Sequence, residues 1–163
     1  MSSDLVRVLG VDPGLGITGY SVIDGDMRIP KLIEAGCIRI NKKLSLDKRL
    51  KQIFDDLSQI IQCFKPDVMV VEELYSHYNH PKTAIIMGHA RGVIYLCAAN
   101  NGLLVKSFTA NRIKMSLTGS GHATKSQIQN MIKNRFSLVK IPEPPDVADA
   151  IAIALCYYNT MKF

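Results

Sequence analysis

The sequence predicts an α/β protein with a mixed β-sheet of five strands that is flanked by helices on both faces. Two observations predict this class: apolar runs of strand length gather near the N-terminus, and later strand-like runs alternate with segments of helical periodicity. The chain has 163 residues, of which 47% are apolar and 21% charged, and it contains no low-complexity tract. We therefore expect residues 1–163 to form a single domain.

The first three strands are expected to form an antiparallel opening. VRVLGVD has the pattern of a strand, and after the Pro-Gly-Leu-Gly turn ITGYSVID has the pattern of its hairpin partner. A third strand is expected near residues 31–40. From Leu46 to Phe64 the apolar residues recur at intervals of three and four, which predicts an amphipathic helix that ends before Pro66.

The second half of the chain alternates between strands and helices. VMVVEE is a β-branched run without polar alternation, which is typical of a strand covered on both faces. Pro145 stands at the expected first turn of a final helix that is rich in Ala, Ile and Leu. Between these two segments we expect a helix at 81–99, a strand at 104–106 and two helices at 109–117 and 124–136.

Positive charge is concentrated in one segment of the chain. The net charge is +6, and the segment 106–140 holds seven lysine or arginine residues and no aspartate or glutamate. A surface of one sign suits a phosphate-rich polymer, because each neutralised phosphate releases a counterion. The alternative is a solvated face that only aids solubility.

The cellular setting is expected to be the cytoplasm. The N-terminal residues lack the pattern of a secretory signal, and no apolar run is long enough to span a membrane. The four cysteines form no CxxC pair, so we expect buried, reduced thiols and no disulfide. His77 and His80 have a metal-ligand spacing without further ligands, and we interpret them as polar loop residues that do not bind zinc.

Four acids stand where an acid is locally unexpected: Asp12 after the first strand, Glu72 after VMVV, and Asp146 and Asp149 on one face of the final helix. Each has a simpler explanation. Asp12 could form a turn, Glu72 or its neighbour Glu73 could reach solvent, and the helix acids could favour the helix dipole. One shared site explains all four together, since magnesium prefers carboxylate oxygens and two such ions can hydrolyse a phosphodiester.

Four motifs occur in order across nearly the whole chain: GVDPGLGITGYSVI, VVEELY, NRIKMSLTGSGHATKSQIQ and PPDVADAIAIA. Together they resemble the RuvC family of Holliday junction resolvases. The resemblance implies a ribonuclease-H-like fold, a homodimer, and magnesium-dependent cutting of four-way DNA junctions by paired, symmetric nicks. The expected products carry 5′-phosphate and 3′-hydroxyl ends.

The resemblance also implies roles for single residues. The family's catalytic acids, which hold two Mg²⁺ ions for which Mn²⁺ can substitute, match Asp12, Glu72, Asp146 and Asp149. The aromatic residue that contacts the junction matches Tyr75, which replaces a Phe of some relatives, and the two DNA-facing lysines match Lys114 and Lys125. Further DNA contacts are expected from Arg112 and from Ser120 in the glycine-rich loop, and the family also suggests a branch-migration helicase as a partner.

The helix expected at 81–99 has features of a self-associating surface. Gly88 and Gly92, four residues apart, leave a groove without side chains, and the apolar residues around them cover more of the helix than one core needs. Burial within a single subunit is the alternative.

Three other functions fit parts of the sequence. An ATPase of the sugar-kinase and actin type has a similar opening hairpin, but 163 residues are few for its two lobes. An RNA-processing nuclease of the same fold would use the same acids. A non-catalytic DNA-binding module would need the basic segment and not the acids.

Overall fold

The sheet at the centre of the molecule mixes antiparallel and parallel strands, as predicted. The computed structural model describes residues 5–26, 28–74 and 81–161. Its elements are β1 (Val6–Asp12), β2 (Ile17–Gly25), β3 (Lys31–Arg39), α1 (Leu46–Phe64), β4 (Val68–Glu72), α2 (Pro81–Asn100), β5 (Leu104–Phe108), α3 (Ala110–Thr118), α4 (Lys125–Arg135) and α5 (Pro145–Thr160). The strand order is β3-β2-β1-β4-β5, in which the first three strands are antiparallel and β4 and β5 run parallel to β1.

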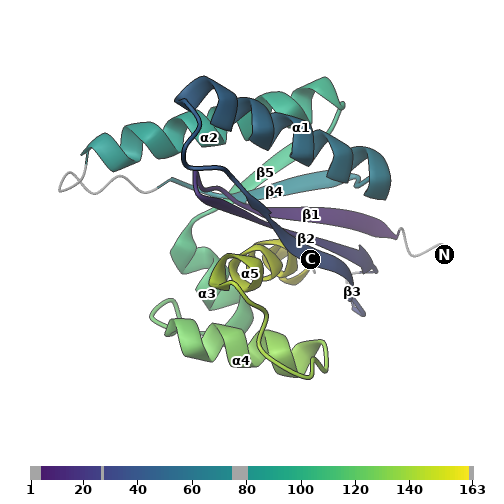
Figure 1. Ribbon diagram of the computed structural model, residues 1–163. Coiled ribbons are helices and arrows are strands. Elements are labelled where there is room, and N and C mark those ends of the chain that lie inside the picture. Colours follow the sequence, from purple (N-terminus) through teal and green to yellow (C-terminus); the bar gives the residue numbers. More distant parts are fainter. Residues whose placement is uncertain (1–4, 27, 75–80, 162–163) are drawn as a thin grey trace.

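Helices cover both faces of this sheet (Figure 1). α1 and α2 lie on one face, and α5 lies on the other, with α3 and α4 packed around it. Side chains alternate along β1, so that Leu9 and Val11 enter the core beneath α1 and α2 while Val8 enters the core against α5. β1 and β4 are therefore buried on both faces, which explains why their sequences are continuously apolar.

α1 is the amphipathic helix that its periodicity predicts. Ile53, Leu57 and Ile61 are buried in the core shared with α2. The four cysteines are free thiols, but the expectation that all are buried is wrong: Cys63 is exposed and Cys37 is only half-buried. Cys63 stands two positions after Ile61, which turns it away from the apolar stripe of the helix.

α5 is buried along most of its length because it lies between the sheet and two other helices. Small residues let it approach the sheet: a Cβ atom added at Gly10 would lie 2.3 Å from the carbonyl oxygen of Ala150. The buried hydroxyl of Ser21, the cross-strand partner of Gly10, donates a hydrogen bond of 2.9 Å to the same oxygen. The helix backbone therefore rests directly on β1 and β2.

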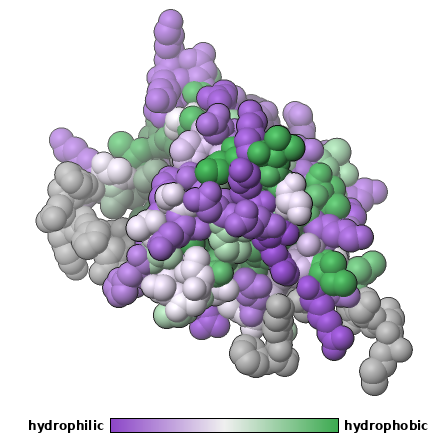
Figure 2. Space-filling view, turned by 90° about the horizontal axis from the view of Figure 1, so that it is seen from below, coloured by the Kyte–Doolittle hydropathy of each residue, from purple (hydrophilic) through white to green (hydrophobic). Residues whose placement is uncertain are grey.

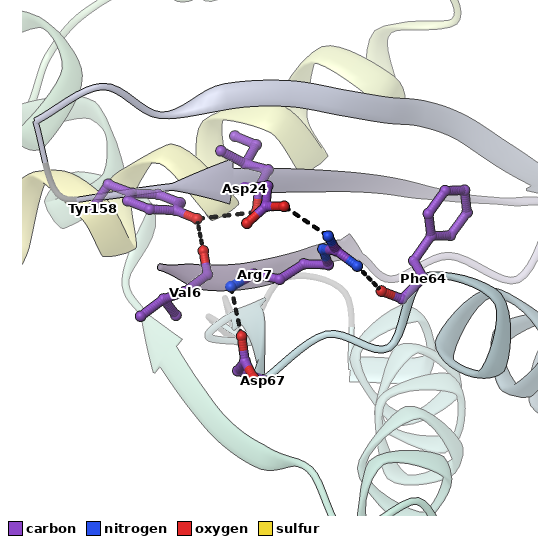
Figure 3. Close-up of polar contacts among 7 residues, drawn as sticks. Val6, Arg7, Asp24, Phe64, Asp67 and Tyr158 are labelled. Atoms are coloured by element: carbon purple, nitrogen blue, oxygen red, sulfur yellow. Dashed lines mark hydrogen bonds and ion pairs between the residues drawn. The ribbon is translucent and has the colours of Figure 1, made fainter. Parts of the chain in front are cut away.

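The other end of α5 is attached to the strands by a polar network (Figure 3). The Tyr158 hydroxyl lies within hydrogen-bonding distance of the carbonyl oxygens of Val6 and Ile23. Beside it, the Arg7 guanidinium pairs with Asp24 at 2.7 Å and donates to the Phe64 carbonyl. These contacts fix the start of β1 to the end of β2, to the end of α1 and to α5.

The surface of the layer formed by α3, α4 and α5 is largely hydrophilic. Figure 2 views the molecule from this side and shows hydrophilic side chains over most of the face, with separate hydrophobic patches. Within the described residues, no helix is both long enough and apolar enough to cross a membrane.

Candidate active site

Two of the four predicted acids stand at the ends of neighbouring parallel strands. Asp12 is the last residue of β1 and Glu72 is the last residue of β4. The register pairs Val11 with Val71, so the two acids that follow are level with each other. Alternation along each strand directs both toward the face that carries α5.

The other two acids come from the first two turns of α5. Asp146 and Asp149 are three residues apart, and each side chain is partly exposed. Gly19 faces Asp12 across the hairpin, and a Cβ atom added to it would lie 2.1 Å from the Asp146 carbonyl oxygen. The missing side chain at Gly19 therefore lets the start of α5 reach the end of β1.

The four carboxylates influence one another electrostatically. The pKa of Asp12 is raised from 3.8 to about 8, first by burial and then by the negative charges of Asp149, Glu72 and Asp146. The pKa of Glu72 is also raised, first by burial and then by Asp149. A group of like charges where the ends of β1 and β4 meet the start of α5 strongly favours a bound cation.

Two lysines border the same site. A cleft of about 270 Å³ is lined by Glu72 and Asp149 together with Lys114 from α3 and Lys125 from α4. Lys125 Nζ lies 3.2 Å from Asp149 Oδ2, and Lys114 lowers the pKa of Glu72. The cleft thus combines acids that suit a metal with cations that suit a phosphate.

The donor set fits magnesium, because it consists of carboxylate oxygens. In the described part of the chain, however, no three Asp, Glu, His or Cys side chains are grouped tightly enough to hold one metal ion in their present positions. One reason is visible at Asp149, whose carboxylate is paired with Lys125. A bound ion would require these side chains to rotate toward it.

The remaining predicted DNA contacts, Arg112 and Ser120, are not among the residues that line the cleft. Arg112 and Ser120 are exposed, and the Ser120 hydroxyl accepts a hydrogen bond from the backbone N–H of His122. Gly88 and Gly92 are exposed on α2, and a Cβ atom added to either would have no neighbour within 4 Å among the described residues. The predictions for Tyr75, His77 and His80 concern residues outside the described part of the chain.

Two residues that help to build the site were not among the sequence predictions. Gly19 brings α5 to Asp12, and Arg91 on α2 donates to the backbone carbonyl of Glu72. The Arg91 guanidinium also lies 5.0 Å from the centre of the Tyr95 ring and donates to its hydroxyl at 2.7 Å. The i, i+4 spacing of Arg91 and Tyr95 was a readable signal for this pair, whereas the contact with Glu72 depends on the tertiary fold.

The sheet order and the acids at the ends of β1, β4 and the start of α5 define a ribonuclease-H-like protein with a candidate nuclease site. The family model described as "Crossover junction endodeoxyribonuclease RuvC" matches residues 8–157. The chain belongs to this family.

Relatives and a solved structure agree with this assignment. The chain is 48% identical over 149 residues to the crossover junction endodeoxyribonuclease RuvC of Rhodopirellula baltica, covering 91% of this chain and 84% of the relative. It is 45% identical over 150 residues to the corresponding protein of Desulforamulus reducens, covering 92% and 91%. The structure of T. thermophilus RuvC in complex with a Holliday junction substrate superposes with a TM-score of 0.88 at 26% identity, covering 95% of this chain and 94% of that one.

Proposed function

We propose that this chain is a structure-selective endonuclease that resolves four-way DNA junctions by paired, symmetric nicks. Membership of the family makes it a metal-dependent hydrolytic nuclease. The observation that carries the proposal is the group of four acids at the ends of β1 and β4 and the start of α5, beside Lys114 and Lys125. Acids of this kind suit metal-assisted phosphodiester hydrolysis, and the neighbouring lysines suit the substrate's phosphates.

In this proposal Asp12, Glu72, Asp146 and Asp149 hold two Mg²⁺ ions, for which Mn²⁺ can substitute. When bound, such ions activate the attacking water and stabilise the leaving oxygen. Lys114 and Lys125 hold the phosphates next to the scissile bond, and Arg112 and Ser120 contact the DNA backbone further along. Cleavage leaves 5′-phosphate and 3′-hydroxyl ends.

We also propose that residues 1–163 act as one nuclease domain and that two copies associate through α2. Ile85, Ile86 and Leu96 are exposed on this helix, by 63%, 44% and 54% respectively. The bare surface at Gly88 and Gly92 would let a second helix approach closely. A two-fold dimer carries two sites, one for each of two strands of a junction, which is the geometry that symmetric nicking needs.

Two further parts of the proposal rest on the family pattern alone. Tyr75 would stack on an unpaired base at the crossover, and a branch-migration helicase would act together with the nuclease. Stacking of this kind is sequence-tolerant because every base offers a flat face.

The test is cleavage of a synthetic four-way DNA junction during a magnesium titration. Asp12→Asn, Glu72→Gln, Asp146→Asn and Asp149→Asn should each bind the junction and lower the cleavage rate by about 100-fold or more, because each removes a ligand whose ion contributes several kcal/mol. Glu73→Gln is the matched control: Glu73 is the exposed neighbour of Glu72, and its loss should change cleavage little.

The same assay separates the alternatives. Cleavage of structured RNA in preference to the junction would favour an RNA-processing nuclease. Unchanged nicking by Asp12→Asn, or tight binding without cleavage at any magnesium concentration, would overturn the proposed active site and leave a DNA-binding module.

A further inference from the structure

Lys125 is held in position by the local structure of α4. It is the first residue of this helix, and Thr124 before it forms a capping box with Gln127, in which each side chain bonds to the other's backbone N–H. This arrangement fixes the backbone from which the Lys125 side chain extends. The side chain crosses from α4 to α5 and donates to Asp149 Oδ2 at 3.2 Å.

The ion pair joins a proposed DNA contact to a proposed metal ligand. Lys125 is also the cation that lowers the pKa of Asp12 against the effect of the other acids. The pair is only partly shielded, because the Lys125 side chain is 58% exposed and the Asp149 side chain is 33% exposed. Ion pairs with this exposure are weak and exchange readily.

We propose that Lys125 is an exchangeable counterion, which pairs with Asp149 in the protein free of metal and DNA and moves to a DNA phosphate when a metal ion takes its place. This inference rests on the proposed function, in which Asp149 is a metal ligand. The lysine and the metal ion compete for the same carboxylate oxygens, and their positive charges repel each other at that distance. Metal binding therefore frees the Lys125 ammonium group at the rim of the cleft, where the substrate's phosphates would bind.

The consequence is that metal and junction DNA bind cooperatively. A metal ion that displaces Lys125 makes this residue available to DNA, and DNA that captures Lys125 makes Asp149 available to metal. Such coupling is reciprocal by thermodynamic linkage. A lysine suits this exchange better than an arginine, since its compact ammonium group sits on a flexible stem while a guanidinium holds a carboxylate through two parallel hydrogen bonds.

Lys114 provides a matched comparison. It lines the same cleft and affects Glu72 electrostatically, but it makes no ion pair with a carboxylate in the part of the chain that the structure describes. Removing Lys114 therefore removes a nearby positive charge without freeing a paired metal ligand. If replacing Lys125 changes Mg²⁺ affinity more than replacing Lys114 does, the difference measures the ion pair between Lys125 and Asp149.

The experiment measures Mg²⁺ affinity by calorimetry in the protein without DNA. Lys125→Met should bind Mg²⁺ about two- to fivefold more tightly than the wild-type chain, in line with the loss of a partly exposed ion pair. Lys114→Met should give a smaller increase, and Lys125→Arg should bind Mg²⁺ less tightly than wild type.

A second readout tests the coupling directly. Junction affinity is measured by fluorescence anisotropy with Ca²⁺ and with EDTA; the wild-type chain should bind more tightly with Ca²⁺, and Lys125→Met should lose most of this gain. The wild-type chain must first bind Mg²⁺ and cleave the junction. If Lys125→Met then binds Mg²⁺ no more tightly than wild type, the counterion role is overturned and the proposed function stands. A wild-type chain that neither binds Mg²⁺ nor cleaves would overturn both.

Discussion

Gly19 and Asp146 touch backbone to backbone, because a Cβ atom on Gly19 would lie 2.1 Å from the Asp146 carbonyl oxygen. The contact places the first turn of α5 against the β-hairpin at the level of Asp12, which pairs with Gly19 across the strands. Because Gly19 has no side chain, the start of α5, which carries Asp146 and Asp149, can lie close to Asp12.

Gly19→Ala should therefore damage both stability and cleavage. The added methyl group meets a backbone atom that cannot rotate away, so α5 must shift, and the free energy of unfolding should fall by about 1–3 kcal/mol, as in overpacked cores. Urea unfolding and junction cleavage measure the two effects. Gly121→Ala is the control for stability, because its new methyl group would meet its nearest neighbour at an ordinary 3.7 Å. Wild-type stability in Gly19→Ala would contradict the close contact.

The stability of the metal-free protein should depend on the protonation of Asp12. Since burial and the other acids raise its pKa from 3.8 to about 8, the folded protein retains a proton between these two pH values that the unfolded chain releases. The free energy of unfolding therefore falls as the pH rises from 3.8 to about 8. The contribution of Asp12 is fully retained below the lower pKa and fully lost above the higher one.

Asp12→Asn removes this dependence, so the variant should be more stable than wild type in EDTA, by a margin that grows with pH across that window. Urea unfolding at several pH values measures the difference. Saturating Mg²⁺ should stabilise the wild-type chain and not the variant. A margin that stays constant with pH would show that Asp12 titrates near its ordinary value.

Tyr158→Phe should loosen the end of α5 that lies far from the acids. The substitution removes a buried hydroxyl that lies within hydrogen-bonding distance of two backbone carbonyl oxygens, one in β1 and one in β2. We expect a loss of about 1–2 kcal/mol in the free energy of unfolding. Tyr157→Phe is the matched control, since the Tyr157 hydroxyl makes no hydrogen bond to the described residues. Equal losses in both variants would contradict the anchoring role of Tyr158.

Lys114→Met should weaken junction binding through loss of a phosphate contact. If Lys114 neutralises one phosphate, the slope of log affinity against log salt concentration should become shallower by about 0.9. Lys48→Met, an exposed lysine of α1 on the opposite side of the sheet, should leave the slope unchanged. A wild-type slope in the Lys114 variant would place this lysine outside the DNA interface.

Much of the fold could be predicted because local patterns and burial agree. The three-four spacing of α1 and the continuous apolar runs of β1 and β4 follow from which faces are covered. The ten expected elements are present, and their ends differ from expectation by a few residues. β5 continues to Phe108, beyond the expected end at Lys106, because it pairs with β4 as far as Glu72. That pairing is tertiary and has no signal in the strand itself.

The arrangement of the site could be predicted only in part. The position of Asp12 and Glu72 at strand ends was readable, since each follows an apolar run. The close approach of α5 through Gly19, the contact of Arg91 with Glu72, and the ion pair of Lys125 with Asp149 join residues that are distant in sequence. Such pairs depend on how the helices lie on the sheet, which periodicity does not determine.

The strand order carries a consequence for how the molecule moves. β1 and β4, which end in Asp12 and Glu72, each have a neighbour on both sides, so their amides should exchange with deuterium only when the whole protein unfolds. α3 and α4, which carry the lysines, lie outside α5 and should open by themselves more often. Rigidity is thus expected beneath the proposed active site, and the helices that carry the proposed DNA contacts should adapt more easily to the shape of a branched substrate.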